Sequence, residues 1–284
     1  MIEASALGSK GQHVTRSIQI MPGAELFFQR GGPVGCLVIH GFASSPGEVR
    51  WLAQALAEDG HTVLAPRLPG HGTHPRDLAR LRWQDWLAHL LDADALLRAA
   101  CDQVVVIGHS MGGLLALRLA LDTGVSGVAV LASPLQFASR GIRYARWLKY
   151  VRPYTDQTDR TALGENMKAE QARRGEPQLG RIRYDIWPTA ALAQLYALSQ
   201  QVDAVLPELR APLLLIYSEA DTTALPASGQ RLFDRAGSAS KKLLLLKESG
   251  HNLPVDSERE AVFAQVSGFV RAATVRSDSS YSVM

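Results

Sequence analysis

The stretch VVVIGHSMGGLLALRLA at residues 104–120 constrains the fold more than any other part of the sequence. β-Branched residues lead into Gly-His-Ser-Met-Gly-Gly, and an apolar run rich in helix-forming residues follows. This order predicts a buried strand, a very sharp turn with Ser110 at its apex, and a helix. The residues two before and two after the serine must be small in such a turn, and Gly108 and Gly112 meet that need.

A Gly-rich turn between a strand and a helix can also cradle a phosphate or serve packing alone. A Walker-type phosphate loop needs Gly-Lys followed by Ser or Thr, which this stretch lacks, and residues 108–113 do not spell Gly-x-Gly-x-x-Gly. The context therefore favours a nucleophilic Ser110. The start of the following helix would also favour negative charge beside it.

Strand-like and helix-like segments alternate over most of residues 1–134 and 208–273, which predicts an α/β core with a doubly wound, mainly parallel sheet. Residues 135–207 contain helix-like pieces but no convincing strand. We expect them to form a small helical cap, inserted after the fourth parallel strand-like segment and placed over the carboxyl ends of the strands. Residues 274–284 have no core pattern and are expected to be a mobile tail.

Local signals predict finer features. Residues 17–20 and 25–29 are typical of an N-terminal hairpin. Ser45 is a good N-cap for the next helix, with Glu48 at the capping-box position. Asp256 is expected to cap the final helix rather than to act in chemistry.

A serine hydroxyl needs a base, and the base needs an orienting acid. In a fold of this kind the acid and then the histidine follow the serine along the chain. His251 is the only histidine after residue 109, and it lies in a loop after a strand-like run. The acid should follow the preceding strand, where Asp221 lies further into the loop than Glu219. We therefore prefer Asp221 and keep Glu219 as the second choice.

An oxyanion hole requires two backbone N–H groups. One is expected at Met111, directly after the nucleophile. The other is expected at Phe42, in the loop after the first parallel strand, where Phe42 would also line the acyl pocket. His40 precedes the tight Gly41 turn and is expected to be structural.

Several ordered motifs together resemble one superfamily. They are HGFASSPGEVRWLAQAL, APRLPGHG, GHSMGG, SEAD and ESGHNLPVDSERE. The chain resembles the α/β-hydrolases, in particular the bacterial monoacylglycerol lipase and carboxylesterase group with a small cap. The resemblance implies a triad of Ser110, Asp221 and His251, with Phe42 and Met111 donating to the oxyanion. It implies hydrolysis of carboxylic esters with short or medium acyl chains, monoacylglycerol-like esters included, without a cofactor or metal.

Alternatives remain within and outside enzymes. A thioesterase or a C–C bond hydrolase can use the same triad. A ligand-binding protein can keep the fold with little turnover, because a fold does not specify a function.

The cap supplies apolar side chains that can roof a pocket. The pocket residues proposed from the sequence are Phe42, Trp147, Ile186, Trp187 and Leu192, with Phe137, Tyr144, Tyr184, Leu195 and Tyr196 as further candidates for the roof. Within residues 140–151, an apolar stripe of Tyr144, Trp147, Leu148 and Val151 is flanked by Arg140, Arg143, Arg146 and Lys149. We expect the stripe to pack over the pocket; the alternative is a basic amphipathic helix that meets a lipid surface.

Composition limits the remaining classes. A net charge of +3, spread along 284 residues, argues against a nucleic-acid partner and leaves a small-molecule ester or lipid as the expected one. No apolar run has membrane-spanning length and no secretory signal is recognisable, so we expect no stable membrane insertion and a cytoplasmic location.

Cys36 and Cys101 are expected to be reduced thiols. His71 and His74 lack further ligands at metal-binding spacing and are interpreted as loop residues at the mouth of the site.

Overall fold

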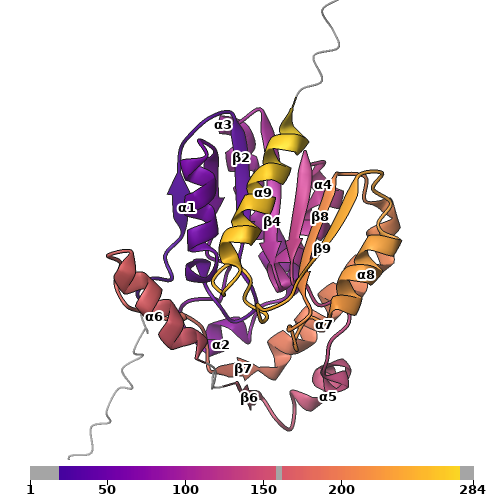
Figure 1. The fold of residues 1–284 in the computed structure, drawn as a ribbon. Helices are drawn as coiled ribbons and strands as arrows, with labels where there is room; N and C mark the ends of the chain where they lie inside the picture. Colours follow the sequence, from indigo (N-terminus) through magenta and orange to yellow (C-terminus); the bar gives the residue numbers. More distant parts are fainter. Residues whose placement is uncertain (1–18, 158–161, 276–284) are drawn as a thin grey trace, which may run out of the picture.

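The computed structural model describes residues 19–157 and 162–275, and seven strands within these residues form one sheet (Figure 1). Their spatial order is β1 (Phe27–Gln29), β3 (Thr62–Ala65), β2 (Val34–Ile39), β4 (Gln103–His109), β5 (Gly127–Leu131), β8 (Leu213–Ser218) and β9 (Lys241–Leu246). All neighbours are parallel except β1, which runs antiparallel to β3. The predicted α/β fold with a doubly wound, mainly parallel sheet is confirmed.

Helices cover both faces of the sheet. In Figure 1, α1 (Arg50–Glu58) and α9 (Arg259–Thr274) lie in front of the strands, and α3 (Trp83–Ala100) and α4 (Met111–Thr123) lie behind them. α8 (Pro226–Arg235) packs against β8 and β9. Because the central strands are covered on both faces, β5 and β8 are buried along their whole length, as their continuous apolar sequences predict.

The direction of winding reverses next to β2. The chain passes from β2 to β3 on one side and then returns to β4 on the other side of β2. The carboxyl ends of β2 and β4 therefore lie side by side, with Ile39 in register with Gly108. Open α/β sheets bind their ligands at such a switch point, and the loops that carry Phe42 and Ser110 both begin there.

The segment predicted to form the cap contains η2 (Arg140–Tyr144), α5 (Ala145–Leu148), β6 (Tyr154–Asp156), α6 (Leu163–Arg173), β7 (Ile186–Pro188) and α7 (Thr189–Val205). The expectation that it holds no strand is wrong, because β6 and β7 pair antiparallel. Three residues in each strand are too few to produce a readable alternation. α7 packs against α3 and α4 as well as α5, and the division of the chain into a core and a cap at residues 135–207 stays a prediction.

The prediction of an N-terminal hairpin is also wrong for the residues that the structure describes. Residues 19 and 20 form no strand, and residues 17 and 18 lie outside the described residues. β1 instead takes the edge position beside β3. Most of the expected tail, residues 276–284, lies outside the described part as well.

The helix after β2 begins differently from the expectation. A short 3-10 helix, η1 (Pro46–Glu48), precedes α1. Ser45 is the N-cap residue of η1, but its Oγ donates to the Ile182 carbonyl oxygen at 3.0 Å instead of accepting a capping hydrogen bond. The predicted capping-box role of Glu48 is wrong, because its carboxylate turns into the protein and accepts the Gly41 N–H at 2.8 Å. Two further short elements are α2 (Pro75–Leu78) and η3 (Leu206–Glu208).

None of the helices in the described ranges is long and apolar enough to cross a membrane.

Candidate active site

Ser110 occupies a strained turn between β4 and α4. Its φ of 54° and ψ of −120° lie in a region that non-glycine residues rarely adopt. A Cβ on Gly108 would come within 2.2 Å of the Gly112 carbonyl oxygen, and one on Gly112 within 2.2 Å of the Ile39 carbonyl oxygen. The expectation that both positions must be glycine-sized is confirmed. Strand β5 holds the turn, since the Ser110 N–H donates to the Leu131 carbonyl oxygen at 2.8 Å.

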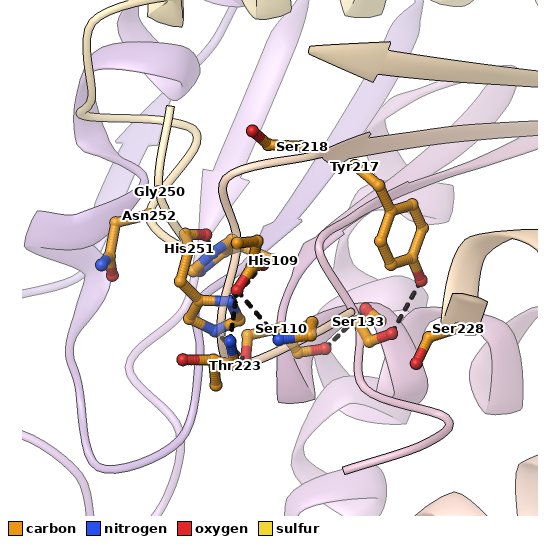
Figure 2. Close-up of polar contacts among 12 residues, drawn as sticks. His109, Ser110, Ser133, Tyr217, Ser218, Thr223, Ser228, Gly250, His251 and Asn252 are labelled. Carbon is orange, nitrogen blue, oxygen red and sulfur yellow. Dashed lines mark hydrogen bonds and ion pairs between the residues drawn. The ribbon is translucent and has the colours of Figure 1, made fainter. Parts of the chain in front are cut away.

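The structure brings together the three residues expected to form a triad. His251 Nε2 lies 2.9 Å from Ser110 Oγ, and His251 Nδ1 lies 2.8 Å from Asp221 Oδ2 (Figure 2 shows Ser110 and His251). The Asp221 carboxylate accepts a hydrogen bond from the N–H group at Nδ1, which leaves Nε2 free to accept the hydroxyl proton of Ser110. The arrangement can therefore deprotonate a serine hydroxyl during attack.

Asp221 is buried, whereas Glu219 is exposed to solvent. Asp221 Oδ1 also accepts the backbone N–H groups of Thr223 at 2.7 Å and Ala224 at 2.9 Å. Burial alone would raise the pKa of Asp221, but the hydrogen bond and charge of His251, together with these N–H groups, hold it below its ordinary value. Asp221 therefore stays a carboxylate beside His251.

Two acidic residues brace the loop that carries His251. Asp256 Oδ2 accepts the Gly250 N–H at 2.8 Å, and Glu258 Oε2 accepts the Ser249 N–H at 2.7 Å. The expectation that Asp256 caps the final helix is wrong, because Glu258 is the N-cap residue of α9. Both carboxylates are used to satisfy backbone donors of the loop instead.

The loop after β2 runs alongside Ser110. A Cβ on Gly41 would lie 3.3 Å from Ser110 Cβ, and Phe42 follows as a buried residue. Ala43 has a φ of 55°. Met111 is the first residue of α4, where a backbone N–H has no acceptor within the helix. The N–H groups of Phe42 and Met111 thus belong to two chain segments that meet at Ser110.

Three histidines near these loops have structural partners. His40 is buried, its Nδ1 donates to the Gly41 carbonyl oxygen at 2.9 Å and its Nε2 accepts the Leu68 N–H at 3.2 Å. Burial lowers the pKa of His40 to about 4, and its two hydrogen bonds to the backbone agree with the structural role expected for it. His71 is fully buried rather than at the mouth of the site, so that expectation is wrong. His74 caps α2 by accepting the Arg76 N–H.

His71 is enclosed because the loop after β3 folds inward. Its ring packs edge-on against Trp86 at 5.7 Å and Phe42 at 6.3 Å between centroids. Within the described ranges, no group of three or more His, Cys, Asp or Glu residues could hold a metal ion.

Glu48 and His109 form a buried pair that the sequence analysis missed. His109 Nδ1 lies 3.0 Å from Glu48 Oε2, and His109 Nε2 lies 2.9 Å from the carbonyl oxygen of His251. Figure 2 shows His109 directly beside His251, and their ring centroids are 5.1 Å apart. No spacing rule connects position 48 to position 109, so only the fold reveals the pair.

The proposed pocket residues do not all lie in one place. Phe42 and Trp187 pack edge-to-face with ring centroids 5.3 Å apart, and Leu192 is half-buried against the core. Trp147 is 61% exposed and Ile186 is 46% exposed, so neither side chain is enclosed in a closed slot. Phe42, Trp187 and Leu192 remain the pocket candidates that the structure buries at least partly.

The stripe on residues 144–151 faces solvent. Val151 is 80% exposed, and the Arg146 guanidinium stacks over the Trp147 ring at 4.4 Å. The expectation that this stripe packs over the pocket is wrong, because η2 and α5 are too short to bury one continuous face against the neighbouring α7. The alternative of a lipid-facing segment stays a prediction.

A cavity of about 280 Å³ lies next to the loop that carries Asp221. Its lining consists of Leu135, Gln136, Phe137, Ser139, Ile142, Arg143, Tyr196 and Gln200. Phe137 forms an isolated β-bridge with Ala224, whose N–H donates to Asp221, and this bridge connects the cavity wall to the acid loop. Phe137 and Tyr196, two of the expected roof residues, thus line a hollow near the triad residues.

Comparison with known proteins identifies the family. The sequence profile described as the alpha/beta hydrolase family matches residues 36–266. The chain belongs to this family. All three residues of the Ser110, Asp221 and His251 constellation lie within the matched range.

Relatives within the alpha/beta hydrolase family cover most of the chain. A thermostable monoacylglycerol lipase of Bacillus sp. (strain H-257) is 31% identical over 244 residues, covering 86% of this chain and 92% of the relative. A carboxylesterase of Bacillus subtilis (strain 168) is 25% identical over 247 residues, covering 86% and 95%. A solved structure from work on the metagenome-derived lipolytic enzymes LipS and LipT is 30% identical, with a TM-score of 0.80, and the match covers 89% of this chain and all of that one.

Proposed function

We propose that this alpha/beta hydrolase cleaves carboxylic esters, with monoacylglycerol-like esters of short or medium acyl chains as its substrate class. The observation that carries the proposal is the continuous hydrogen-bonded line from Asp221 through His251 to Ser110, in a chain whose relatives include a monoacylglycerol lipase and a carboxylesterase. The proposed partner is a small-molecule ester or lipid, with no nucleic acid and no stable membrane insertion. The cytoplasmic location expected from the sequence stays a prediction.

The geometry supports a two-step reaction. His251 Nε2 removes the hydroxyl proton as Ser110 Oγ attacks the ester carbonyl carbon, and Asp221 stabilises the imidazolium that forms. The backbone N–H groups of Phe42 and Met111 receive the oxyanion. The alcohol leaves with the proton from His251, and an acyl group stays on Ser110. Water activated by His251 then releases the carboxylic acid and regenerates the serine.

The decisive experiment measures turnover of p-nitrophenyl esters and monoacylglycerols by the wild type and by Ser110→Ala. Removal of the nucleophile should lower kcat by about 10³-fold or more. A fluorophosphonate should label Ser110 in the wild type. Labelling of a different serine, or equal turnover by Ser110→Ala, would contradict the proposal. Acyl-CoA and vinylogous diketone substrates in the same panel separate ester hydrolysis from thioester and C–C bond hydrolysis.

A further inference from the structure

The buried contact between Glu48 and His109 is the unexplained polar feature nearest to the triad residues. Both side chains are almost completely buried, and neither contacts the Ser110 hydroxyl. Glu48 Oε2 accepts two hydrogen bonds, one from His109 and one from the Gly41 N–H. His109 reaches in the opposite direction to the carbonyl oxygen of His251.

The hydrogen-bond partners define the charge of His109. One ring nitrogen faces a carboxylate and the other faces a backbone carbonyl, and both of these groups only accept hydrogen bonds. Both ring nitrogens must therefore carry a proton, which makes His109 an imidazolium. Burial alone would lower the pKa of His109, but the charge and hydrogen bond of Glu48 outweigh it and raise the pKa.

The surroundings of His109 agree with this charge. The carboxylates of Glu48 in η1 and of Asp221 in the loop after β8 favour a positive charge on His109, and so does the backbone carbonyl of His251. His40, which follows β2, does not compete for the charge, because burial lowers its pKa. Burial would raise the pKa of Glu48, but the charge and hydrogen bond of His109, together with the charge of Arg181 and the Gly41 N–H, hold it well below the ordinary range. The pair is thus a buried carboxylate and a buried imidazolium.

Each end of the pair terminates on the backbone of a functional loop. Gly41 directly precedes Phe42, and His109 directly precedes Ser110. The imidazole of His251 is the proposed general base. We propose that Glu48 and His109 form a positioning pair that holds the Phe42 loop and the His251 loop in register with Ser110. This inference rests on the proposed esterase function.

If Glu48 and His109 only stabilised the fold, they would not need to be charged. A buried ion pair can often be replaced by neutral groups without loss of stability, whereas removal of one partner leaves an uncompensated charge. Stability and positioning can therefore be separated. Glu48→Gln combined with His109→Leu removes both charges of the pair and keeps a side-chain acceptor for the Gly41 N–H. It also removes the hydrogen bond from His109 to the His251 carbonyl oxygen.

The experiment compares wild type, both single variants and this double variant on a p-nitrophenyl ester. Each single variant should lower the melting temperature by about 5 °C or more. The double variant should recover most of that loss, yet its kcat should stay about tenfold below wild type with KM within about twofold, because a displaced His251 impairs the chemical step. Recovery of wild-type kcat together with the melting temperature would overturn the proposal, and so would a change confined to KM.

A matched control neutralises a different ion pair, which lies outside the candidate active site. Arg98 Nε lies 2.6 Å from the mostly buried Asp94 in α3, and Asp94→Asn with Arg98→Leu should leave kcat unchanged. An equal kcat loss in this control would mean that any neutralised pair slows the enzyme, which also overturns the proposal. The rate of fluorophosphonate labelling should fall in the Glu48/His109 double variant as kcat does. If the wild type is labelled but hydrolyses no ester, the proposed function fails, while the labelling rates still test the positioning pair.

Discussion

Asp221 Oδ2 lies 2.8 Å from His251 Nδ1, and this contact favours Asp221 over Glu219 as the acid that orients the proposed base. Glu219, two residues earlier, is exposed. Asp221→Asn should lower kcat by about 10⁴-fold, because an amide stabilises the wrong tautomer of the imidazole. Glu219→Gln is the matched control and should stay within about twofold of wild type. Steady-state kinetics on one ester suffices, and a larger loss in Glu219→Gln would reverse the assignment.

The sharp turn at Ser110 predicts a strong effect of one added methyl group. In Gly112→Ala the new Cβ would lie 2.2 Å from the Ile39 carbonyl oxygen and 2.7 Å from that of His40, so β2 and α4 would have to separate. We expect a loss of about 3 kcal/mol in the free energy of unfolding.

Gly268→Ala in α9 is the control for Gly112→Ala, since a Cβ there meets nothing within 4 Å. It should be neutral or stabilising by up to about 1 kcal/mol. Urea denaturation of both variants provides the measurement. A Gly112→Ala protein as stable as wild type would contradict the packing described for the turn.

The sequence was sufficient for the parts of the site that follow local rules. Ser110 is predictable because Gly108 and Gly112 mark its turn, and His251 because no other histidine follows residue 109. The parallel sheet is predictable because apolar runs alternate with helix-like segments. These features depend on neighbours in the chain or on a single candidate.

The rest depends on contacts between distant residues. Glu48 has the spacing of a capping residue, but the fold places His109 and the Gly41 N–H closer than the helix start. Asp256 likewise satisfies Gly250 rather than α9. A side chain with the spacing of a helix cap can thus accept a hydrogen bond from a backbone N–H elsewhere in the fold instead. The sequence does not reveal which backbone N–H groups will be buried and need such an acceptor.

The pKa shift of His109 predicts a pH dependence of stability. Because the folded pKa is raised, the stabilisation by protonated His109 is complete below its unfolded pKa of about 6.5 and is lost as pH rises through the folded pKa. Wild type should therefore lose stability relative to the Glu48→Gln/His109→Leu protein as the pH rises above about 6.5.

The comparison between the two proteins is needed because other histidines act in the opposite direction. Burial is the largest cause that lowers the pKa values of His40 and His71, so their contributions increase with pH, and this burial is common to both proteins. Urea unfolding at several pH values gives the difference. A constant difference across this range would contradict an imidazolium at position 109.

The exposed aromatic residues of α5 and of the turn that follows it predict contact with anionic lipid. Trp147 and Tyr150 are exposed, Arg146 and Lys149 stack on their rings, and the sequence has no acidic residue between positions 135 and 155. Ser110→Ala protein should cosediment with phosphatidylglycerol vesicles, and added salt should weaken binding. Trp147→Ala with Tyr150→Ala should reduce binding several-fold, whereas Phe28→Ala, an exposed residue on β1, should not. Equal binding to purely zwitterionic vesicles would remove the electrostatic part of the argument.

The contact between Phe42 and Trp187 predicts how acyl length is selected. The two rings meet edge-to-face next to the loop expected to bind the oxyanion, and we expect Trp187 to limit the space available to an acyl chain there. Each methylene that the site buries contributes about 0.8 kcal/mol, and kcat/KM should increase with chain length until this space is filled. In the wild type we expect octanoate esters to exceed both acetate and palmitate esters, and monoolein to exceed triolein, whose two extra acyl chains must be accommodated.

Trp187→Ala should move the optimum to longer chains, because it removes the ring that Phe42 packs against. Phe28→Ala on β1 lies outside the site and should leave the profile unchanged. The measurement is kcat/KM for acetate, butyrate, octanoate and palmitate esters with each protein. If Trp187→Ala lowered kcat/KM by the same factor for every ester, the ring would affect the site as a whole and would not set acyl length. A wild-type preference for triolein over monoolein would contradict a restricted site altogether.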